Sequence, residues 1–333
     1  MHNEMDIVMK TKWILLLAVL AMMAGCDTEV ENIVIQKPNE YSEQYFADLR
    51  AWKQTEHEVT YAYFASYTNA KTPTSWGERL RGLPDSLDIV NLWSDIPTPE
   101  DWPLAYGDMV YCQQTLGTRF VMHADAAHYN HECWDREWDA ATGSFSIRRD
   151  ASGNPVVVKT VSGNEASIRA YARWAVDTLV RCGLDGVDFD YEGWRAQDIT
   201  WLADECDKYL GVGGRWPEKL LIIDWFNAAP PAETEPYVDY YVRQAYTWQI
   251  GFQTGSGGRP IEKTILCESM GAEAADGGIN GARIRDYAAW EPDEGHKAGC
   301  GAFYLDYNYK SQSGIPYKEF REAIQIMNPA RHP

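Results

Sequence analysis

Acidic residues occupy every second position at the end of the segment 185–192, which reads DGVDFDYE. Side chains of an extended strand alternate between two faces, so Asp188, Asp190 and Glu192 point in the same direction. Burying several carboxylates together is unfavourable unless they share protons, so such a cluster does not serve stability. It can serve catalysis, because burial and neighbouring charges keep one carboxyl protonated near neutral pH. We therefore predict a catalytic line of carboxyls in this segment.

Two kinds of chemistry suit this carboxyl line: acid catalysis of glycosidic bond cleavage, and binding of a divalent metal. A metal ion needs oxygen ligands that converge from several directions, whereas a single strand supplies one line. The chain also has no CxxC pair and no histidines at zinc spacing, so we expect neither a metal nor another cofactor. An exposed edge strand is a third interpretation, but Leu184 and Val187 are typical of a buried strand. Gly186 lets another backbone pass closely at the start of the strand.

The elements around this segment alternate between strand-like and helix-like patterns. Helical periodicity is clearest at 164–181 and 196–210, and a helix with one apolar face is expected around residue 45. Short β-branched and aromatic runs predict eight buried strands, at 58–66, 87–93, 118–124, 184–191, 219–225, 238–246, 263–268 and 301–307. This tally predicts an α/β fold, a single-domain (β/α)8 TIM barrel. A doubly wound sheet is the alternative, but no Gly-rich phosphate turn follows the first strand.

The carboxyl line falls on the fourth predicted strand, and barrel active sites lie at the carboxyl ends of the strands. The sixth strand carries Gln244 and Tyr246, which alternation points inward together. Two long loops, 125–156 and 250–260, should lie on the same face. Six further residues at or near strand ends are candidates for sugar contacts: Tyr63, Asp224, Trp225, Asn227, Glu268 and Asp306.

The N-terminus predicts export and a lipid anchor. Lys10 and Lys12 precede a short apolar run at 13–23, too short to span a bilayer, and small residues lead to Cys26. This ending resembles a bacterial lipobox, in which the cysteine becomes the first residue and carries lipid. We therefore expect three segments: a lipoprotein signal peptide at 1–25, an acidic tether at 26–41 and the catalytic domain at 42–333.

Composition limits the class of partner. The net charge of -19 argues against a nucleic acid, because an acidic surface gains nothing from displacing counterions. The 14 Trp and 20 Tyr residues could fill a core or form a carbohydrate site, where flat rings stack on sugar faces. Six cysteines remain besides Cys26, and Cys182 and Cys267 lie in or beside apolar runs that predict buried thiols. We expect a monomer.

The segment 185–192 resembles the DGxDxDxE signature of glycoside hydrolase family 18, at every fixed position. The resemblance implies a substrate-assisted, retaining mechanism on the fourth strand of a barrel. It assigns Glu192 as the proton donor to the glycosidic oxygen and Asp190 as the group that holds the acetamido N–H of the substrate. Asp188 would share a proton with Asp190, and Tyr246 would hydrogen-bond the acetamido carbonyl.

Within that family, Gln244-Ala-Tyr246 resembles the endo-β-N-acetylglucosaminidases that cleave the chitobiose core of N-glycans, whereas chitinases usually carry Met-x-Tyr-Asp. The third strand lacks the Ser-x-Gly-Gly of chitinases, and the eighth lacks their tryptophan. The resemblance thus implies an N-glycan or glycoprotein substrate. Together with the lipobox it implies an enzyme tethered to the outer membrane, facing the cell surface or, as the alternative, the periplasm. A chitinase remains an alternative, as does a glycan-binding lipoprotein on the same scaffold. The intact Glu192 argues against a binding protein, which gains nothing from a proton donor.

Overall fold

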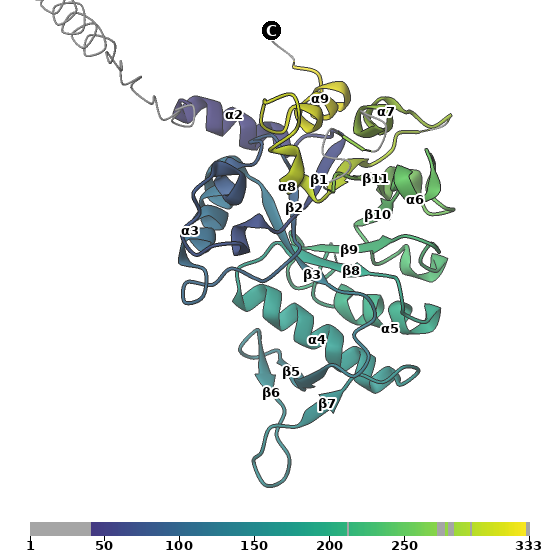
Figure 1. The fold of residues 1–333 in the computed structure, drawn as a ribbon. Helices are drawn as coiled ribbons and strands as arrows, with labels where there is room; N and C mark the ends of the chain where they lie inside the picture. Colours follow the sequence, from purple (N-terminus) through teal and green to yellow (C-terminus); the bar gives the residue numbers. More distant parts are fainter. Residues whose placement is uncertain (1–40, 212, 272–276, 279–282, 294, 331–333) are drawn as a thin grey trace, which may run out of the picture. The chain divides into compact units, whose positions relative to one another are not determined.

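Eight parallel strands close into a barrel in the computed structural model of the chain (Figure 1). The structure describes residues 41–330 except 212, 272–276, 279–282 and 294. The predicted signal peptide, the lipidation site at Cys26 and nearly all of the tether lie outside the described residues. Everything described below belongs to the unit Glu43–Pro333.

The barrel strands confirm the predicted fold class. Their order around the barrel is β1-β12-β11-β10-β9-β8-β3-β2, so each strand pairs with its neighbours in the sequence apart from the inserted strands β4 to β7. The eight barrel strands are β1 (Val59–Phe64), β2 (Ile89–Leu92), β3 (Arg119–Ala124), β8 (Gly186–Asp190), β9 (Leu220–Trp225), β10 (Tyr240–Gln244), β11 (Thr264–Ser269) and β12 (Gly299–Phe303). The predicted carboxyl line therefore begins on the fourth barrel strand, β8.

Helices follow most of the strands and cover the barrel. The longest, α4 (Glu165–Arg181), begins where the Asn164 side chain accepts the backbone N–H of Ser167 at 3.1 Å. The predicted helices are confirmed at α4, at α5 (Ala196–Asp207) and at α2 (Glu43–Lys53). The others are α3 (Pro103–Tyr111), α6 (Thr247–Ile250), α7 (Arg283–Ala289), α8 (Leu305–Asn308) and α9 (Lys318–Met327). Short 3₁₀ turns include η1 (Ser66–Thr68).

Side-chain alternation divides the apolar residues of the strands between two cores. Val187 and Phe189 of β8 pack outward against the helices, and Ile222 of β9 packs inside the barrel. Gly186 is required at the start of β8, because a Cβ there would lie 2.4 Å from the carbonyl oxygen of Leu220. The outward packing of the residues between the carboxyls leaves Asp188 and Asp190 for the inner face.

The segment after β3, predicted as a loop at 125–156, instead folds into two antiparallel ribbons. One pairs β4 (Glu132–Trp134) with β7 (Val157–Lys159), and the other pairs β5 (Arg136–Asp139) with β6 (Ser144–Ile147). Three- and four-residue strands with mixed composition carry too little periodicity to be recognised in the sequence. Both ribbons pack against α4, on its outer side in Figure 1.

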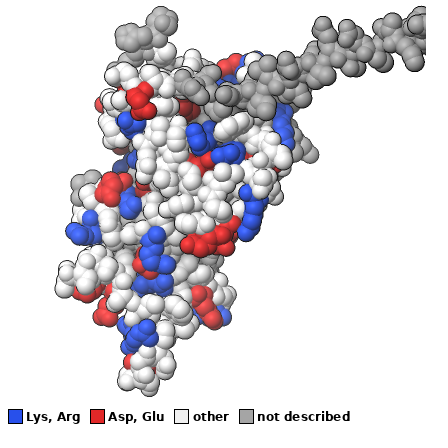
Figure 2. All heavy atoms as spheres, turned by 90° about the vertical axis from the view of Figure 1, so that its left-hand side faces the viewer, with Lys and Arg blue, Asp and Glu red and all other residues white. Residues whose placement is uncertain are grey.

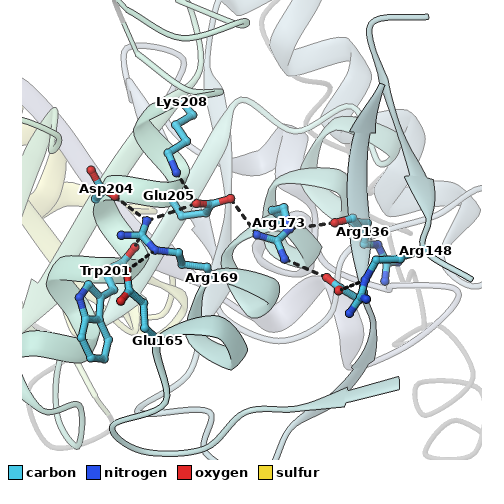
Figure 3. A network of polar contacts seen from close by, with 10 residues as sticks. Arg136, Arg148, Glu165, Arg169, Arg173, Trp201, Asp204, Glu205 and Lys208 are labelled. Atoms are coloured by element: carbon cyan, nitrogen blue, oxygen red, sulfur yellow. Dashed lines mark hydrogen bonds and ion pairs between the residues drawn. The ribbon is translucent and has the colours of Figure 1, made fainter. Parts of the chain in front are cut away.

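A network of ion pairs fastens these ribbons to the helices (Figure 3). Arg173 of α4 lies at its centre and contacts Glu205 of α5 at 2.9 Å and Asp135 at 2.9 Å. Arg173 also donates to the carbonyl of Arg136 at 2.8 Å, and Asp135 contacts Arg148 at 2.6 Å. Because Asp135 and Glu205 are buried, these arginines neutralise charges that would otherwise be unpaired.

The eighth strand lies earlier than predicted, at Gly299–Phe303 instead of 301–307. Its glycines have low strand propensity but are needed for close packing, since a Cβ at Gly299 would lie 1.8 Å from the carbonyl oxygen of Val59. Tyr304 then adopts a left-handed conformation with φ of 52°, which ends the strand and starts α8. Asp306 consequently lies in α8, three residues after the strand, so the prediction that the strand extends to 307 is wrong.

The face of the molecule in Figure 2 carries lysines, arginines, aspartates and glutamates interspersed, with no broad area of one sign. Cys112, Cys133, Cys182, Cys206, Cys267 and Cys300 are free thiols. Cys267 is buried as predicted, whereas Cys182 is only half-buried. Within the described ranges, no helix is long and apolar enough to cross a membrane.

Candidate active site

The carboxyls of β8 progress from the barrel interior toward solvent. Asp188 is fully buried, Asp190 is 7% exposed, and Glu192 is exposed two residues beyond the end of the strand. Substrate can therefore reach Glu192 directly, and Asp190 and Asp188 lie behind it. Glu192 is close enough to raise the pKa of both Asp190 and Tyr246.

Asp188 lies in a ring of hydrogen-bond donors from other strands. Its Oδ2 accepts from the Tyr61 hydroxyl at 2.5 Å, from Asn91 Nδ2 at 2.8 Å and from the Tyr63 hydroxyl at 3.4 Å. Tyr61 and Asn91 were not among the predicted site residues. An asparagine inside the otherwise apolar strand Ile89–Leu92 was the available signal, because buried polar groups need partners.

Asp224 of β9 faces the carboxyls of β8. The parallel register places it directly opposite Asp190, and it is fully buried. Its Oδ1 accepts from Gln244 Nε2 at 2.6 Å, while its Oδ2 and the Oδ1 of Asp190 are buried without a hydrogen-bond partner among the described residues. Asp224 was expected to contact sugars, but the structure places it behind Gln244 and Asp190.

Burial sets the electrostatics of the cluster. It raises the pKa of Asp188 and of Asp224 well above the usual range of aspartate. The charge of a neighbouring carboxyl raises each pKa further, from Asp224 for Asp188 and from Asp190 for Asp224. Burial, followed by the charge of Glu192, raises the pKa of Asp190 to about 7. The group therefore holds protons at neutral pH instead of three negative charges.

Tyr246 and Gln244 lie at the end of the sixth barrel strand, on the side of these carboxyls. β10 ends at Gln244, and Tyr246 directly precedes α6. The Tyr246 ring is buried and stacks on Phe303 with ring centroids 5.4 Å apart. Phe303 in turn packs edge-to-face on Trp93 at 4.9 Å. Tyr246, Phe303 and Trp93 thus form an aromatic group at the carboxyl end of the barrel, and the last two were not among the predicted site residues.

The remaining candidates for sugar contacts fall into different environments. Tyr63 is buried among the carboxyls, and Asn227 is exposed beyond β9. Trp225 packs on the other side of β9, where the guanidinium of Arg243 lies 5.3 Å from its ring centroid. The structure therefore separates Trp225 from the carboxyl cluster.

Glu268 and Asp306 bind backbone amides. Glu268 is fully buried and its Oε1 accepts from the N–H of Thr247 at 3.0 Å, so it fixes the chain that follows Tyr246. Asp306 accepts from the N–H of Ala65 at 3.1 Å and of Ser66 at 2.6 Å. Both carboxylates hold loops that border the site.

One group of three side chains in the described ranges could bring metal ligands together. His123, Asp188 and Asp224 each offer one ligand atom, and these atoms lie within 4.8 Å of one another. Asp188 Oδ2 already accepts a hydrogen bond from Asn91, and Asp224 Oδ1 accepts one from Gln244. These donors and the raised pKa values fit a group that shares protons, and we assign no metal to it.

Stability should fall as the pH rises through neutrality. Asp190 and Glu268 both have pKa values raised to about 7, from ordinary values of 3.8 and 4.5, so the folded protein binds more protons than the unfolded chain between these limits. Ionising Asp190 in place costs on the order of 4 kcal/mol. We expect Tm to be roughly 5–10 °C lower at pH 8.5 than at pH 6, measured by calorimetry. The double variant Asp190→Asn, Glu268→Gln should lose less Tm over this interval than wild type, and the fall that remains comes from the buried carboxyls of Asp188 and Asp224. A wild-type Tm that rises over this interval would contradict the expectation.

Known proteins resemble this chain in sequence. Residues 26–275 match glycoside hydrolase family 18, BT1044-like. The chain is 25% identical over 316 residues, 85% of each protein, to endo-β-N-acetylglucosaminidase F2 of Elizabethkingia meningoseptica.

Two solved structures share the fold. An endo-β-N-acetylglucosaminidase variant from Cordyceps militaris, in complex with fucosyl-N-acetylglucosamine-Asn, superposes with a TM-score of 0.63 at 18% identity, covering 87% of this chain and 98% of that one. A variant of BT1044 gives a TM-score of 0.62 at 20% identity, covering 86% and 93%. At these identities the structural likeness shows the fold alone.

Proposed function

The chain belongs to glycoside hydrolase family 18, and we propose that it is an endo-β-N-acetylglucosaminidase that cleaves the GlcNAc-β1,4-GlcNAc core of N-linked glycans. The observation that carries the proposal is the arrangement of an exposed Glu192 beside a buried Asp190 whose pKa is about 7. Gln244 and Tyr246 flank these carboxyls where chitinases of the family usually carry Met and Tyr. The similarity to endo-β-N-acetylglucosaminidase F2, over most of both chains, supports the same choice.

In the proposed reaction, Glu192 gives its proton to the glycosidic oxygen as the bond to the anomeric carbon breaks. The carbonyl oxygen of the substrate's 2-acetamido group attacks the anomeric carbon from the opposite face and forms an oxazolinium ring. Asp190 accepts the acetamido N–H and offsets the positive charge that develops, while the Tyr246 hydroxyl donates to the acetamido oxygen. The Glu192 carboxylate then takes a proton from water, which opens the ring with net retention.

The buried residues keep Asp190 ready for this role. Asp188 is held by Tyr61 and Asn91, so it cannot turn away from Asp190 without losing two hydrogen bonds. The aromatic group of Tyr246, Phe303 and Trp93 offers apolar ring surface beside the reacting sugar. Because the nucleophile belongs to the substrate, a sugar without an N-acetyl group would not react.

The N-terminal sequence supports a location for this chemistry. We propose that lipid on Cys26 tethers the enzyme to the outer membrane, where it meets glycoproteins at the cell surface. Lys10, Lys12 and the apolar run at 13–23 support this proposal. Fatty-acid labelling that persists in a Cys26→Ser variant would contradict it.

The substrate is tested by incubating the protein with an N-glycosylated protein and, separately, with chitin oligomers. We expect intact-mass spectrometry to show one N-acetylglucosamine left on each glycosylated asparagine, and NMR to show the β-anomer as the first free product. The same preparation of a Glu192→Gln variant is the control for contaminating activity. Cleavage of chitin oligomers without cleavage of the glycoprotein would overturn the N-glycan assignment.

A further inference from the structure

We propose that Asp224 is a positioning residue of this site: a neutral carboxyl that donates a hydrogen bond to Asp190 and accepts one from Gln244. The inference rests on the proposed function, because it concerns the two groups that flank the reacting sugar. It adds a third buried carboxyl, contributed by the neighbouring strand, to the carboxyl line of β8. Asp224 touches no substrate in this proposal and acts through its two neighbours.

The backbone places Asp224 where it can reach both neighbours. The register of β8 and β9 sets Asp190 opposite Asp224, and that of β9 and β10 sets Val242 opposite Asp224, two residues before Gln244. One oxygen, Oδ1, accepts from Gln244 Nε2 at 2.6 Å. The other oxygen, Oδ2, is buried and has no donor among the described residues, and the same is true of Asp190 Oδ1.

A proton between these two carboxyls explains the buried oxygens. Asp190 and Asp224 are register partners on adjacent strands, and each has a buried oxygen without a donor; two ionised carboxylates cannot satisfy each other, because neither has a hydrogen to donate. An unprotonated pair would also bury two adjacent negative charges, which is strongly unfavourable. One of the two is therefore the donor.

Burial decides that Asp224 holds the proton. Asp224 is fully buried, whereas Asp190 is 7% exposed and closer to solvent. Burial raises the pKa of Asp224 well above its usual range, and that of Asp190 only to about 7. As the pH rises through 7, Asp190 therefore ionises first and Asp224 stays neutral.

Asp190 and Asp224 are surrounded by further titratable groups, which the elements packed against the two carboxyls contribute. They are Asp188 of β8, His123 and Asp125 at the end of β3, Tyr61 and Tyr63 of β1, Cys267 of β11, and Glu192 and Tyr246 beyond the ends of β8 and β10. The negative charge of Glu192 opposes ionisation of Asp190, which makes the donated hydrogen bond from Asp224 more important for that step.

The same bond orients Gln244. Because Nε2 of its amide is occupied by Asp224 Oδ1, the amide cannot rotate freely, and its oxygen is turned away from Asp224. Asp224 therefore fixes a proton acceptor, Asp190, and an amide, Gln244, in one relative position. A neutral carboxyl suits this task, since it presents one donor and one acceptor.

The test compares Asp224→Asn with Asp224→Leu, two substitutions of similar size. Asparagine keeps a carbonyl for Gln244 and an N–H for Asp190, whereas leucine offers neither. We expect the acid limb of the pH profile of kcat/KM to stay in place in Asp224→Asn, with activity within about threefold of wild type. In Asp224→Leu it should move to higher pH, and kcat/KM at pH 6 should fall by about tenfold or more.

Other outcomes would overturn the proposal. An acid limb that moves to lower pH in Asp224→Asn means that a negative charge was removed, so Asp224 was ionised. Equal pH profiles in both variants leave Asp224 with a packing role only. Each comparison uses one substrate, whichever the wild type cleaves, so the result does not depend on the N-glycan assignment. If the wild type cleaves neither substrate, the proposed function fails. The role of Asp224 is then tested by ¹³C NMR titration of the Asp190 carboxyl in wild type and in Asp224→Asn. An unchanged pKa of Asp190 supports that role, and a lower pKa in Asp224→Asn contradicts it.

Discussion

Glu192→Gln should lower the rate of glycan release by about a thousandfold while leaving the fold intact. Glutamine has the size and shape of glutamate but cannot give a proton to the glycosidic oxygen. Glu192 is exposed beyond the end of β8 and makes no hydrogen bond with another described side chain, so we expect Tm to change by no more than about a degree. The rate is measured by intact-mass spectrometry of an N-glycosylated protein under single-turnover conditions.

The matched control for this variant is Glu137→Gln. Glu137 is also an exposed glutamate, but it lies on β5 in the inserted ribbons. We expect wild-type rates from it. A Glu192→Gln protein with the wild-type rate would remove Glu192 as the proton donor, and a large fall in its Tm would mean that the side chain has a structural role instead.

Asp190→Asn is the second substitution with a large expected effect, a fall in rate of about a hundredfold. The amide can no longer place a negative charge beside the oxazolinium that forms during the reaction. Stability should change in the opposite direction. The substitution removes a buried carboxyl whose pKa of about 7 makes its ionisation unfavourable, so Tm at pH 8.5 should rise above that of wild type.

This opposite movement of rate and stability separates catalysis from packing. A structural aspartate would lose both activity and stability on substitution, because its hydrogen bonds would be broken. Kinetic assays and calorimetry on the same preparation of Asp190→Asn measure the rate and the Tm that this comparison needs. Unchanged activity in Asp190→Asn would contradict its role in holding the acetamido group, and a lower Tm at pH 8.5 would contradict the account of its burial.

These expectations share one physical origin, the accumulation of buried carboxyls on adjacent strands. Asp188, Asp190 and Asp224 come together although each would be more stable in water. The hydrogen bonds of Tyr61, Asn91 and Gln244 compensate in part for this cost. The proteins that maintain such groups do so at functional sites, where a shifted pKa is useful.

The sequence alone predicted the fold class and the position of the carboxyl line. The period-two spacing of Asp188, Asp190 and Glu192 and the alternation of strand and helix patterns are local properties of the chain. They predicted a carboxyl line on the fourth strand of a barrel, and the barrel with its eight strands is confirmed. Gly186 was also interpretable locally, because a glycine that starts a buried strand indicates a close backbone contact.

Only the tertiary structure decided which groups surround that line. Tyr61 donates to Asp188 from 127 positions away, and Asp224 meets Asp190 through a strand register that no local pattern encodes. Closure of the barrel sets that register, and with it the depth of each carboxyl, so that Glu192 is exposed while Asp188 is buried. The sequence predicted Asp224 and Asp306 as sugar contacts at or near strand ends, and it included Asp306 in the eighth strand. In the structure Asp224 is fully buried behind Asp190 and Gln244, and Asp306 lies in α8. Burial and strand termination depend on neighbours that lie far away along the chain, so no local pattern predicts them.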